Sequence, residues 1–264
     1  MGNEVVRYNN AMNQIKFKDF TPMDYNFMMA LCCRVRDKGT SEVVLTFSEI
    51  KTLSNYSTKN DNSRFISDLQ RMNKKLMSVA FSYETDDEIV MFSLFNTFRI
   101  SRKAKTLTVN VNEQFTFILN GLVDNFTRFD LMEFSSLKSR YSKALYRLLK
   151  QWKGTGKYIV RFDDLRNIMD VPKSMKNNAV NRDILTPMLE ELKHYFGNLQ
   201  MIIERDESRR GKPFTNCVFL FDSAKRIAAK EYEVVEETET RPVIKSLSIE
   251  QLIEQDLQML NSNN

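Results

Sequence analysis

The polar run between residues 176 and 182 carries side chains that could read the edges of DNA bases. In the major groove, asparagine forms a bidentate pair with adenine and arginine forms one with guanine. Asn178 and Arg182 are four residues apart, so they would share one face of a helix. The predicted base-reading residues are Lys176, Asn177, Asn178, Asn181 and Arg182. The alternative is that these asparagines only cap a helix or line a loop.

A second group of cations lies in the segment Arg205–Pro213, between two apolar runs that predict the strands of a hairpin. Arg209, Arg210 and Lys212 fall within four residues around a glycine. Cations at a hairpin tip could grip phosphates or the minor groove, which supplies affinity rather than sequence reading. Ordinary hairpin tips are also charged, but this density exceeds what solubility requires.

The sequence argues against catalysis. His194 is the single histidine, so the chain cannot supply the histidine pair of metal-dependent DNA-nicking enzymes. No G-x-x-x-x-G-K-[ST], H-E-x-x-H, C-x-x-C or G-x-S-x-G pattern occurs. The three cysteines have no metal-ligand spacing. We expect no catalytic residue, no metal and no cofactor, and we place His194 at the edge of a core.

The segment Ser136–Trp152, SLKSRYSKALYRLLKQW, predicts an amphipathic helix because its apolar residues recur every three or four positions. No acid occurs in this run. The opposite face carries the cations Lys138, Arg140, Lys143, Arg147, Lys150 and Lys153. A solvated helix face normally mixes charges of both signs, so this face suggests an anionic polymer nearby. The alternative is a basic surface helix with no partner.

The same stretch resembles the helix that opens the second winged-helix domain of iteron-binding plasmid replication initiators of the Rep_3 type. The resemblance covers roughly residues 3–225 and is most specific over 136–220. It implies an α+β fold of two tandem winged-helix domains, each a helix-turn-helix with a β-hairpin wing. It also implies a monomer that binds direct repeats at a plasmid origin and a dimer that represses its own gene. The host replication initiator and helicase would be partners.

The elements of the first half follow the winged-helix order of three helices and then a hairpin. A first helix begins at Thr21-Pro-Met-Asp, where threonine caps and proline occupies the first turn. The further elements expected are helices at 48–53 and Ser63–Val79 and strands at Val43–Phe47, Phe81–Tyr83, Ile89–Phe98 and Thr106–Val111.

The second half repeats this order. Phe162–Ile168 parallels Phe47–Leu53 at an offset of 115 residues: aromatic, polar, acid, apolar, base, polar, apolar. Further along, an apolar stripe recurs at an offset of 120, which predicts a loop five residues longer in the second copy. The stripe pairs Leu185, Leu189, Leu192 and Phe196 with Phe65, Leu69, Met72 and Leu76. An internal repeat of this kind indicates two related winged-helix domains. Pro187 is expected to divide the second recognition helix into two pieces.

We divide the chain into three parts. Residues 1–125 form the first winged-helix domain, which dimerises or makes secondary DNA contacts. Residues 126–230 form the second, which carries the main DNA recognition, and residues 231–264 form an acidic linker and a short amphipathic helix. The DNA-contact candidates of the first domain are Lys59, Asn60, Asn62, Arg64 and Lys74 on its helix-turn-helix, and Arg102, Lys103 and Lys105 on its wing.

Charge is placed unevenly along the 264 residues. The net charge is +5, but residues 231–264 hold eight acids and two bases. The other 230 residues therefore carry 37 bases and 26 acids, a net charge of +11. A basic body with an acidic tail favours nucleic acid as the partner. The apolar stripe after Ser248 would either dock on the body or bind a partner.

The composition excludes several classes of protein. Hydrophobic residues make up 42% of the chain, which supports folded cores. No run approaches the roughly 20 apolar residues of a membrane span, and the N-terminus lacks a signal core, so we expect a cytoplasmic protein without a membrane partner. The residues indicate a sequence-specific binder of double-stranded DNA. The alternatives are a dimeric winged-helix transcriptional regulator without an origin role, and an interaction scaffold that binds protein.

Overall fold

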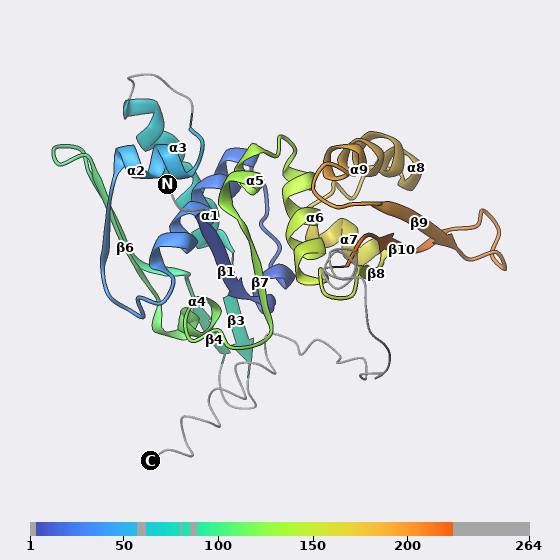
Figure 1. Ribbon diagram of the computed structural model, residues 1–264, viewed down its shortest axis with the longest axis horizontal. Helices are drawn as coiled ribbons and strands as arrows, with labels where there is room; N and C mark the ends of the chain where they lie inside the picture. Colours follow the sequence, from blue (N-terminus) through green and yellow to red (C-terminus); the bar gives the residue numbers. More distant parts are fainter. Residues whose placement is uncertain (1–3, 57–61, 80, 85–88, 224–264) are drawn as a thin grey trace, which may run out of the picture.

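The structure is a computed structural model that describes residues 4–56, 62–79, 81–84 and 89–223. It contains two units, each a helix-turn-helix followed by a hairpin wing (Figure 1). The first unit consists of α1 (Pro22–Val35), β2 (Val43–Thr46), α2 (Phe47–Leu53), α3 (Asn62–Ser78), β3 (Phe81–Glu84), β4 (Ile89–Phe92), β5 (Phe95–Ser101) and β6 (Thr106–Val111). The second consists of α6 (Arg140–Gln151), β8 (Lys157–Arg161), α7 (Phe162–Ile168), α8 (Asn177–Val180), the π-helical segment η3 (Asn181–Leu185), α9 (Thr186–Leu192), β9 (Gln200–Arg205) and β10 (Phe214–Leu220). The predicted pair of winged helices is confirmed.

Each unit has a three-stranded antiparallel sheet in which the strand before the helix-turn-helix pairs with the last strand of the wing. The order is β2-β6-β5 in the first unit and β8-β10-β9 in the second. The β3–β4 hairpin is an addition to the first unit. The expected single strand Ile89–Phe98 is two strands in the structure, β4 and β5, and β4 forms this hairpin with β3.

The two matching heptads both form helices, α2 and α7. α2 begins at Phe47, before the expected Ser48, because Thr46 and not Ser48 caps it. The first and fourth residues of the heptad are buried in both copies, because positions three apart lie on one helix face. In α2 the N-cap is Thr46, whose hydroxyl accepts from the Glu49 amide while the Glu49 carboxylate accepts from the Thr46 amide. α1 begins in the same way at Thr21, as its sequence predicts.

A two-stranded ribbon joins segments that are more than 100 residues apart, and the sequence pattern did not predict it. β1 (Val5–Asn9) pairs antiparallel with β7 (Phe126–Asp130). Residues 126–136, assigned above to the second domain, thus pair with β1 and pack on α1. The boundary between the domains stays a prediction. The remaining elements are η1 (Asn10–Gln14), η2 (Glu113–Phe115), α4 (Thr116–Leu119) and α5 (Leu131–Ser136).

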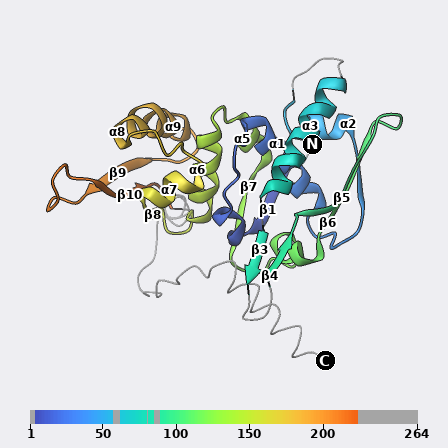
Figure 2. The ribbon, with the colours of Figure 1, turned by 180° about the vertical axis from the view of Figure 1, so that it is seen from behind.

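The basic stretch at 136–152 is not one helix. α5 ends at Ser136 and α6 begins at Arg140, because the Ser139 hydroxyl accepts from the amides of Tyr141 and Ser142 and caps the new helix. α6, the first helix of the second unit, lies at the centre of the molecule, on the side of its unit that faces the first, in both views (Figures 1 and 2). It contacts η1, α1 and β7 on one side and α9 and β8 on the other.

Candidate nucleic-acid interface

The turn of the second helix-turn-helix is braced by Arg166, on α7. Its guanidinium donates to the carbonyls of Pro172 at 3.0 Å and Met175 at 2.8 Å, and to the side-chain oxygen of Asn177. One side chain therefore fixes both the turn and the first residue of α8. Sequence reasoning missed this role of Arg166 and assigned Asn177 to base reading.

The first unit contains the equivalent contact. Lys51, on α2, donates to the side-chain oxygen of Asn62 at 2.8 Å, and Asn62 opens α3. Lys51 and Arg166 occupy the same position of the two heptads. Arg166 follows Lys51, and Asn177 follows Asn62, by the repeat offset of 115 residues. The repeat offset could have revealed the role of Asn177.

This match relocates the five additional residues of the second copy. Because Asn62 corresponds to Asn177, the insertion lies after Asn177, in α8 and η3, and the expected longer loop is wrong. The π-helical segment accommodates it: the Thr186 amide bonds to the Asn181 carbonyl, five residues back. Pro187 then falls in the first turn of α9, where its missing N–H is tolerated. The helix continues through the proline, with a π-segment in place of the expected break.

The inserted residues present only part of the predicted base-reading set to solvent. Lys176, Asn178 and Arg182 are exposed. Asn177 is half-buried and held by Arg166. The side-chain oxygen of Asn181 is buried without a hydrogen-bond partner in the described part of the chain, so it cannot accept from a base. The accessible members of the set are therefore Lys176, Asn178 and Arg182, of which Asn178 and Arg182 lie in the helical segment.

Arg182 is paired with its neighbour in the absence of DNA. Its Nε lies 2.6 Å from Asp183 Oδ1, and its Nη2 lies 2.8 Å from Oδ2. Hydrogen bonding to Arg182 lowers the pKa of Asp183, and the same bond raises the pKa of Arg182. The guanidinium is 77% exposed, so it can exchange this carboxylate for a base edge.

The wing tip, residues 206–213, projects away from the body of the second unit (Figure 1). Arg209 lies 3.2 Å from Asp206, and Lys212 pairs with Glu207. Arg210 is exposed and has no ion pair within the described residues. Arg210 is therefore the wing cation with its full charge available to a phosphate.

The predicted basic face of α6 does not face solvent. Lys143 and Arg147 are 0% exposed. The Lys143 ammonium donates to the Phe134 carbonyl at 2.6 Å, and Arg147 lies 4.8 Å from the Phe17 ring centroid. Lys150 pairs with Glu133 at 2.9 Å. The expectation of an exposed basic face is wrong, because α5 and the segment around η1 cover it.

The ends of this stretch differ from its middle. Arg140 donates to the carbonyl of Asp170 at 2.9 Å and pairs with its carboxylate at 3.4 Å, so it links α6 to the end of α7. Lys138 and Lys153 are exposed. Of the candidates at 138–143, Lys138 keeps an accessible charge, whereas Lys143 is committed to the core.

The candidates of the first unit are spread over two elements. Arg64 and Lys74 are exposed on α3, and Arg102, Lys103 and Lys105 are exposed at the β5–β6 turn. Asn62 accepts from Lys51. Lys59 and Asn60 lie outside the described residues, as does the acidic tail 231–264.

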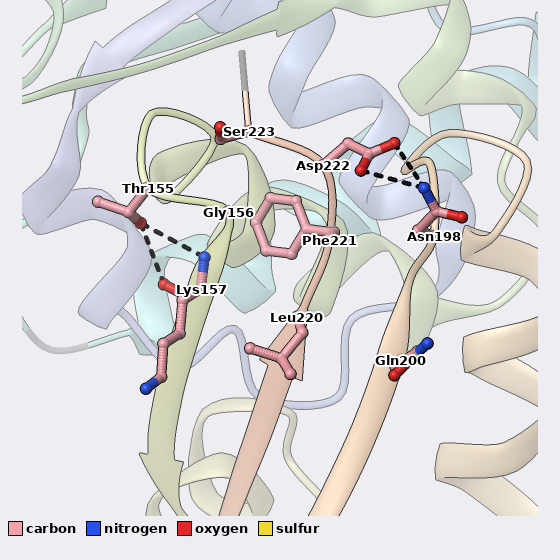
Figure 3. Close-up of a pocket in the computed structure, with 9 residues that line it drawn as sticks. All are labelled: Thr155, Gly156, Lys157, Asn198, Gln200, Leu220, Phe221, Asp222 and Ser223. Atoms are coloured by element: carbon pink, nitrogen blue, oxygen red, sulfur yellow. Dashed lines mark hydrogen bonds between the residues drawn. The ribbon is translucent and has the colours of Figure 1, made fainter. Parts of the chain in front are cut away.

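Among the described residues, no three His, Cys, Asp or Glu side chains gather as metal ligands do. His194 is exposed rather than at a core edge. A cavity of about 470 Å³ at the end of the β8-β10-β9 sheet contains Asn198, which donates to Asp222 at 2.9 and 3.1 Å (Figure 3). None of the described residues that line it is a histidine or a cysteine. No described helix has the length and apolar character of a bilayer span.

Comparisons with known proteins agree with this geometry. The profile of a family described as "Initiator Replication protein, WH1" matches residues 5–150, and one described as "Initiator Rep protein, WH2" matches residues 161–221. A "Probable replication protein rep" of Bifidobacterium longum (strain NCC 2705) is 34% identical over 212 residues, covering 80% of this chain and 70% of the relative. The crystal structure of a Pi initiator protein in complex with iteron DNA superposes with a TM-score of 0.63 at 16% identity, covering 84% of this chain and 98% of that one. At 16% identity, the similarity to the Pi initiator structure shows the fold alone.

Proposed function

The chain belongs to the family of initiator replication proteins, and from this premise we propose that it starts plasmid replication by binding iterons, the repeated sequences of an origin. The second unit supplies sequence recognition by inserting α8 and η3 into the major groove of duplex DNA. Its wing grips the adjacent backbone. The first unit binds the other part of the site or forms a dimer interface.

The observation that carries this proposal is the five-residue insertion in the second helix-turn-helix. It presents Asn178 and Arg182 to solvent, and both residue types pair with base edges. The first unit lacks these positions. Base reading is therefore concentrated in the second unit, while Arg210 on its wing adds a sequence-independent phosphate contact.

Further properties of the proposal rest on the family. The protein represses its own gene as a dimer, recruits the host replication initiator and helicase, and works in the cytoplasm, where its DNA lies. It acts by binding and assembly, without a catalytic step or cofactor of its own.

The experiment is a footprint of the DNA that flanks the protein's own gene, across a titration of the protein. We expect several evenly spaced protected segments, each about two helical turns long, and an affinity that falls steeply with salt. A single protected palindrome would favour the transcriptional regulator instead. Absence of protection at low salt would exclude DNA binding.

A further inference from the structure

A cavity of about 600 Å³ opens beside the β1–β7 ribbon, where α1 ends. These elements lie away from the wing and recognition helix of the second unit (Figure 1). The charged walls of the cavity are Glu4, Arg7, Arg34, Arg36, Asp37 and Arg128. These residues lie on β1 and β7, just before β1, and at or just beyond the C-terminal end of α1, so the cavity depends on the ribbon that the sequence pattern did not predict. It is separate from every DNA-contact candidate considered above.

Two of these arginines stand directly opposite one another. Arg7 pairs in register with Arg128 across the β1–β7 ribbon. Like charges at directly opposed positions destabilise a strand pair. Neither arginine forms an ion pair with any described residue. A bound anion between the two strands would remove this repulsion.

Two of the guanidinium groups, those of Arg7 and Arg36, are held in place by contacts with neutral groups. Arg7 lies 4.0 Å from the centroid of the Phe126 ring and donates to the Leu122 carbonyl. Arg36 donates to the Val5 carbonyl at 2.9 Å. These contacts fix Arg7 without a counter-charge and fix Arg36, whose counter-charge is Asp37, so an anion meets two donors that are already oriented.

The charges of the cavity do not balance. The Glu4 carboxylate forms a bidentate pair with the Arg34 guanidinium, in which both N–O distances are 2.9 Å. Asp37 lies 3.3 Å from Arg36. Glu49, 4.0 Å from Arg34, lies on α2 outside the cavity walls. Four arginines against two carboxylates leave two positive charges, which suit a phosphate group. Such a group carries about −1.5 to −2 as a terminal phosphate at neutral pH and one negative charge as a diester of the DNA backbone.

We propose that this cavity binds a phosphate group through Arg7, Arg36 and Arg128. Guanidinium groups from three elements surround one space, which suits a tetrahedral anion that accepts from several directions. One guanidinium is enough to bind a planar carboxylate in a bidentate pair, as Arg34 binds Glu4. The phosphate belongs either to a free polyphosphate or nucleotide, or to the backbone of DNA that extends past the recognition helix.

The first arm of the test uses the full chain without DNA and inorganic pyrophosphate as the ligand. Calorimetric titration and thermal unfolding are measured at constant ionic strength. We expect Arg128→Ala to weaken pyrophosphate binding at least 10-fold and to abolish the ligand-induced rise in Tm. Without ligand, its Tm should equal or exceed that of the wild type, because the like-charge contact is gone. Arg99→Ala, which removes an exposed arginine paired with Glu42 outside the cavity, is the matched control and should bind as the wild type does.

The second arm identifies the source of the phosphate. If the group comes from DNA, Arg128→Ala lowers the slope of log affinity against log salt by about one, and Arg99→Ala does not. If it is a free ligand, the DNA slope is unchanged and only pyrophosphate binding is lost.

Two results would overturn the proposal: Arg128→Ala unchanged in both arms, or a polyglutamate peptide that competes more strongly than pyrophosphate at the same site. The pyrophosphate arm contains no DNA, so its outcome is independent of origin binding.

Discussion

Arg182 and Asp183 form an exposed ion pair within the inserted helical segment. Under the proposed function, this pair has to open when the second unit binds DNA. In the free protein, the Asp183 carboxylate accepts hydrogen bonds from the Arg182 guanidinium. On specific DNA the guanidinium would exchange it for a guanine edge, whereas on other sequences the exchange gains little. An acid next to a base-reading arginine thus raises discrimination at some cost in affinity.

Arg182→Ala is therefore expected to relax specificity at one base pair and to cost about 1–3 kcal/mol on the cognate site. Binding measured against a panel of single-base variants of the protected repeat tests this. Lys193→Ala, which removes an exposed lysine paired with Glu190 beyond the end of α9, is the control and should leave the preference intact. An unchanged preference in the Arg182 variant would remove it from base reading.

Arg209 and Arg210 are adjacent at the wing tip but differ in their counter-charges. Arg210→Ala should weaken binding to all sequences and lower the salt slope by about one, because it removes one phosphate contact. Arg209→Ala should lower the slope less, since Asp206 already neutralises part of its charge. Salt titrations of both variants on specific and unrelated DNA provide the measurement. A loss confined to one base preference would contradict a backbone role for Arg210.

At the scale of elements, the turns of the two helix-turn-helix motifs are held by the same kind of side-chain hydrogen bond. A basic residue of the first helix donates to the asparagine that opens the second, as Lys51–Asn62 and Arg166–Asn177. Arg166 adds the carbonyls of the turn, so it fixes the direction in which α8 leaves α7. The orientation of Asn178 and Arg182 depends on this contact.

Arg166→Ala should lower the free energy of unfolding by about 1.5–3 kcal/mol, the usual range for hydrogen bonds to a charged group. It should also speed hydrogen exchange in residues 172–178 and weaken specific DNA binding. Chemical denaturation and exchange measurements test these effects. Arg161→Ala, which removes an exposed arginine on neighbouring β8, should have little effect. Specific binding that survives in the Arg166 variant would show that the turn orients α8 without this residue.

At the scale of the whole molecule, α6 joins the two units through buried cations. Lys143 donates to the end of α5, and Asn26, on α1, donates to the Ser135 carbonyl at 3.2 Å and the Ser54 carbonyl at 2.9 Å. The carbonyls that end α2 and α5 are thus tied to α1 and α6. This connects the helix-turn-helix of the first unit to the central helix of the second.

Burial lowers the pKa of Lys143 from 10.5 to about 7, although the nearby charge of Glu191 acts in the opposite direction. Between about pH 7 and 10.5 the unfolded chain therefore holds a proton that the folded chain has lost. Raising the pH through this window favours the folded state, and the burial penalty is present in full below pH 7. The stability difference between the wild type and Lys143→Met should shift toward the wild type by about 1 kcal/mol per pH unit from pH 7 to 9.

Denaturant titrations at several pH values measure this difference. Taking the difference between variant and wild type cancels the titration of tyrosines and cysteines, which both proteins share. Lys153→Met, which removes an exposed lysine just beyond α6, should show no such slope. A pH-independent difference for Lys143→Met would mean that Lys143 stays charged in the fold.

The sequence by itself determined the two winged helices, because their evidence is local or repeated. The threonine cap and the proline after it placed the start of α1, and the matching heptads located α2 and α7 and revealed the duplication. The cations of the wing tip were also accessible to sequence reasoning, since a hairpin tip has no neighbour to bury it.

Only the tertiary structure decided which polar side chains are available to a ligand. A helix with one apolar stripe predicts one buried face, but α6 is covered on both sides, and Lys143 and Arg147 are enclosed by segments distant in the chain. The ribbon that sets Arg7 against Arg128 joins strands over 100 residues apart. Exposure depends on such long-range contacts, which a local pattern does not encode.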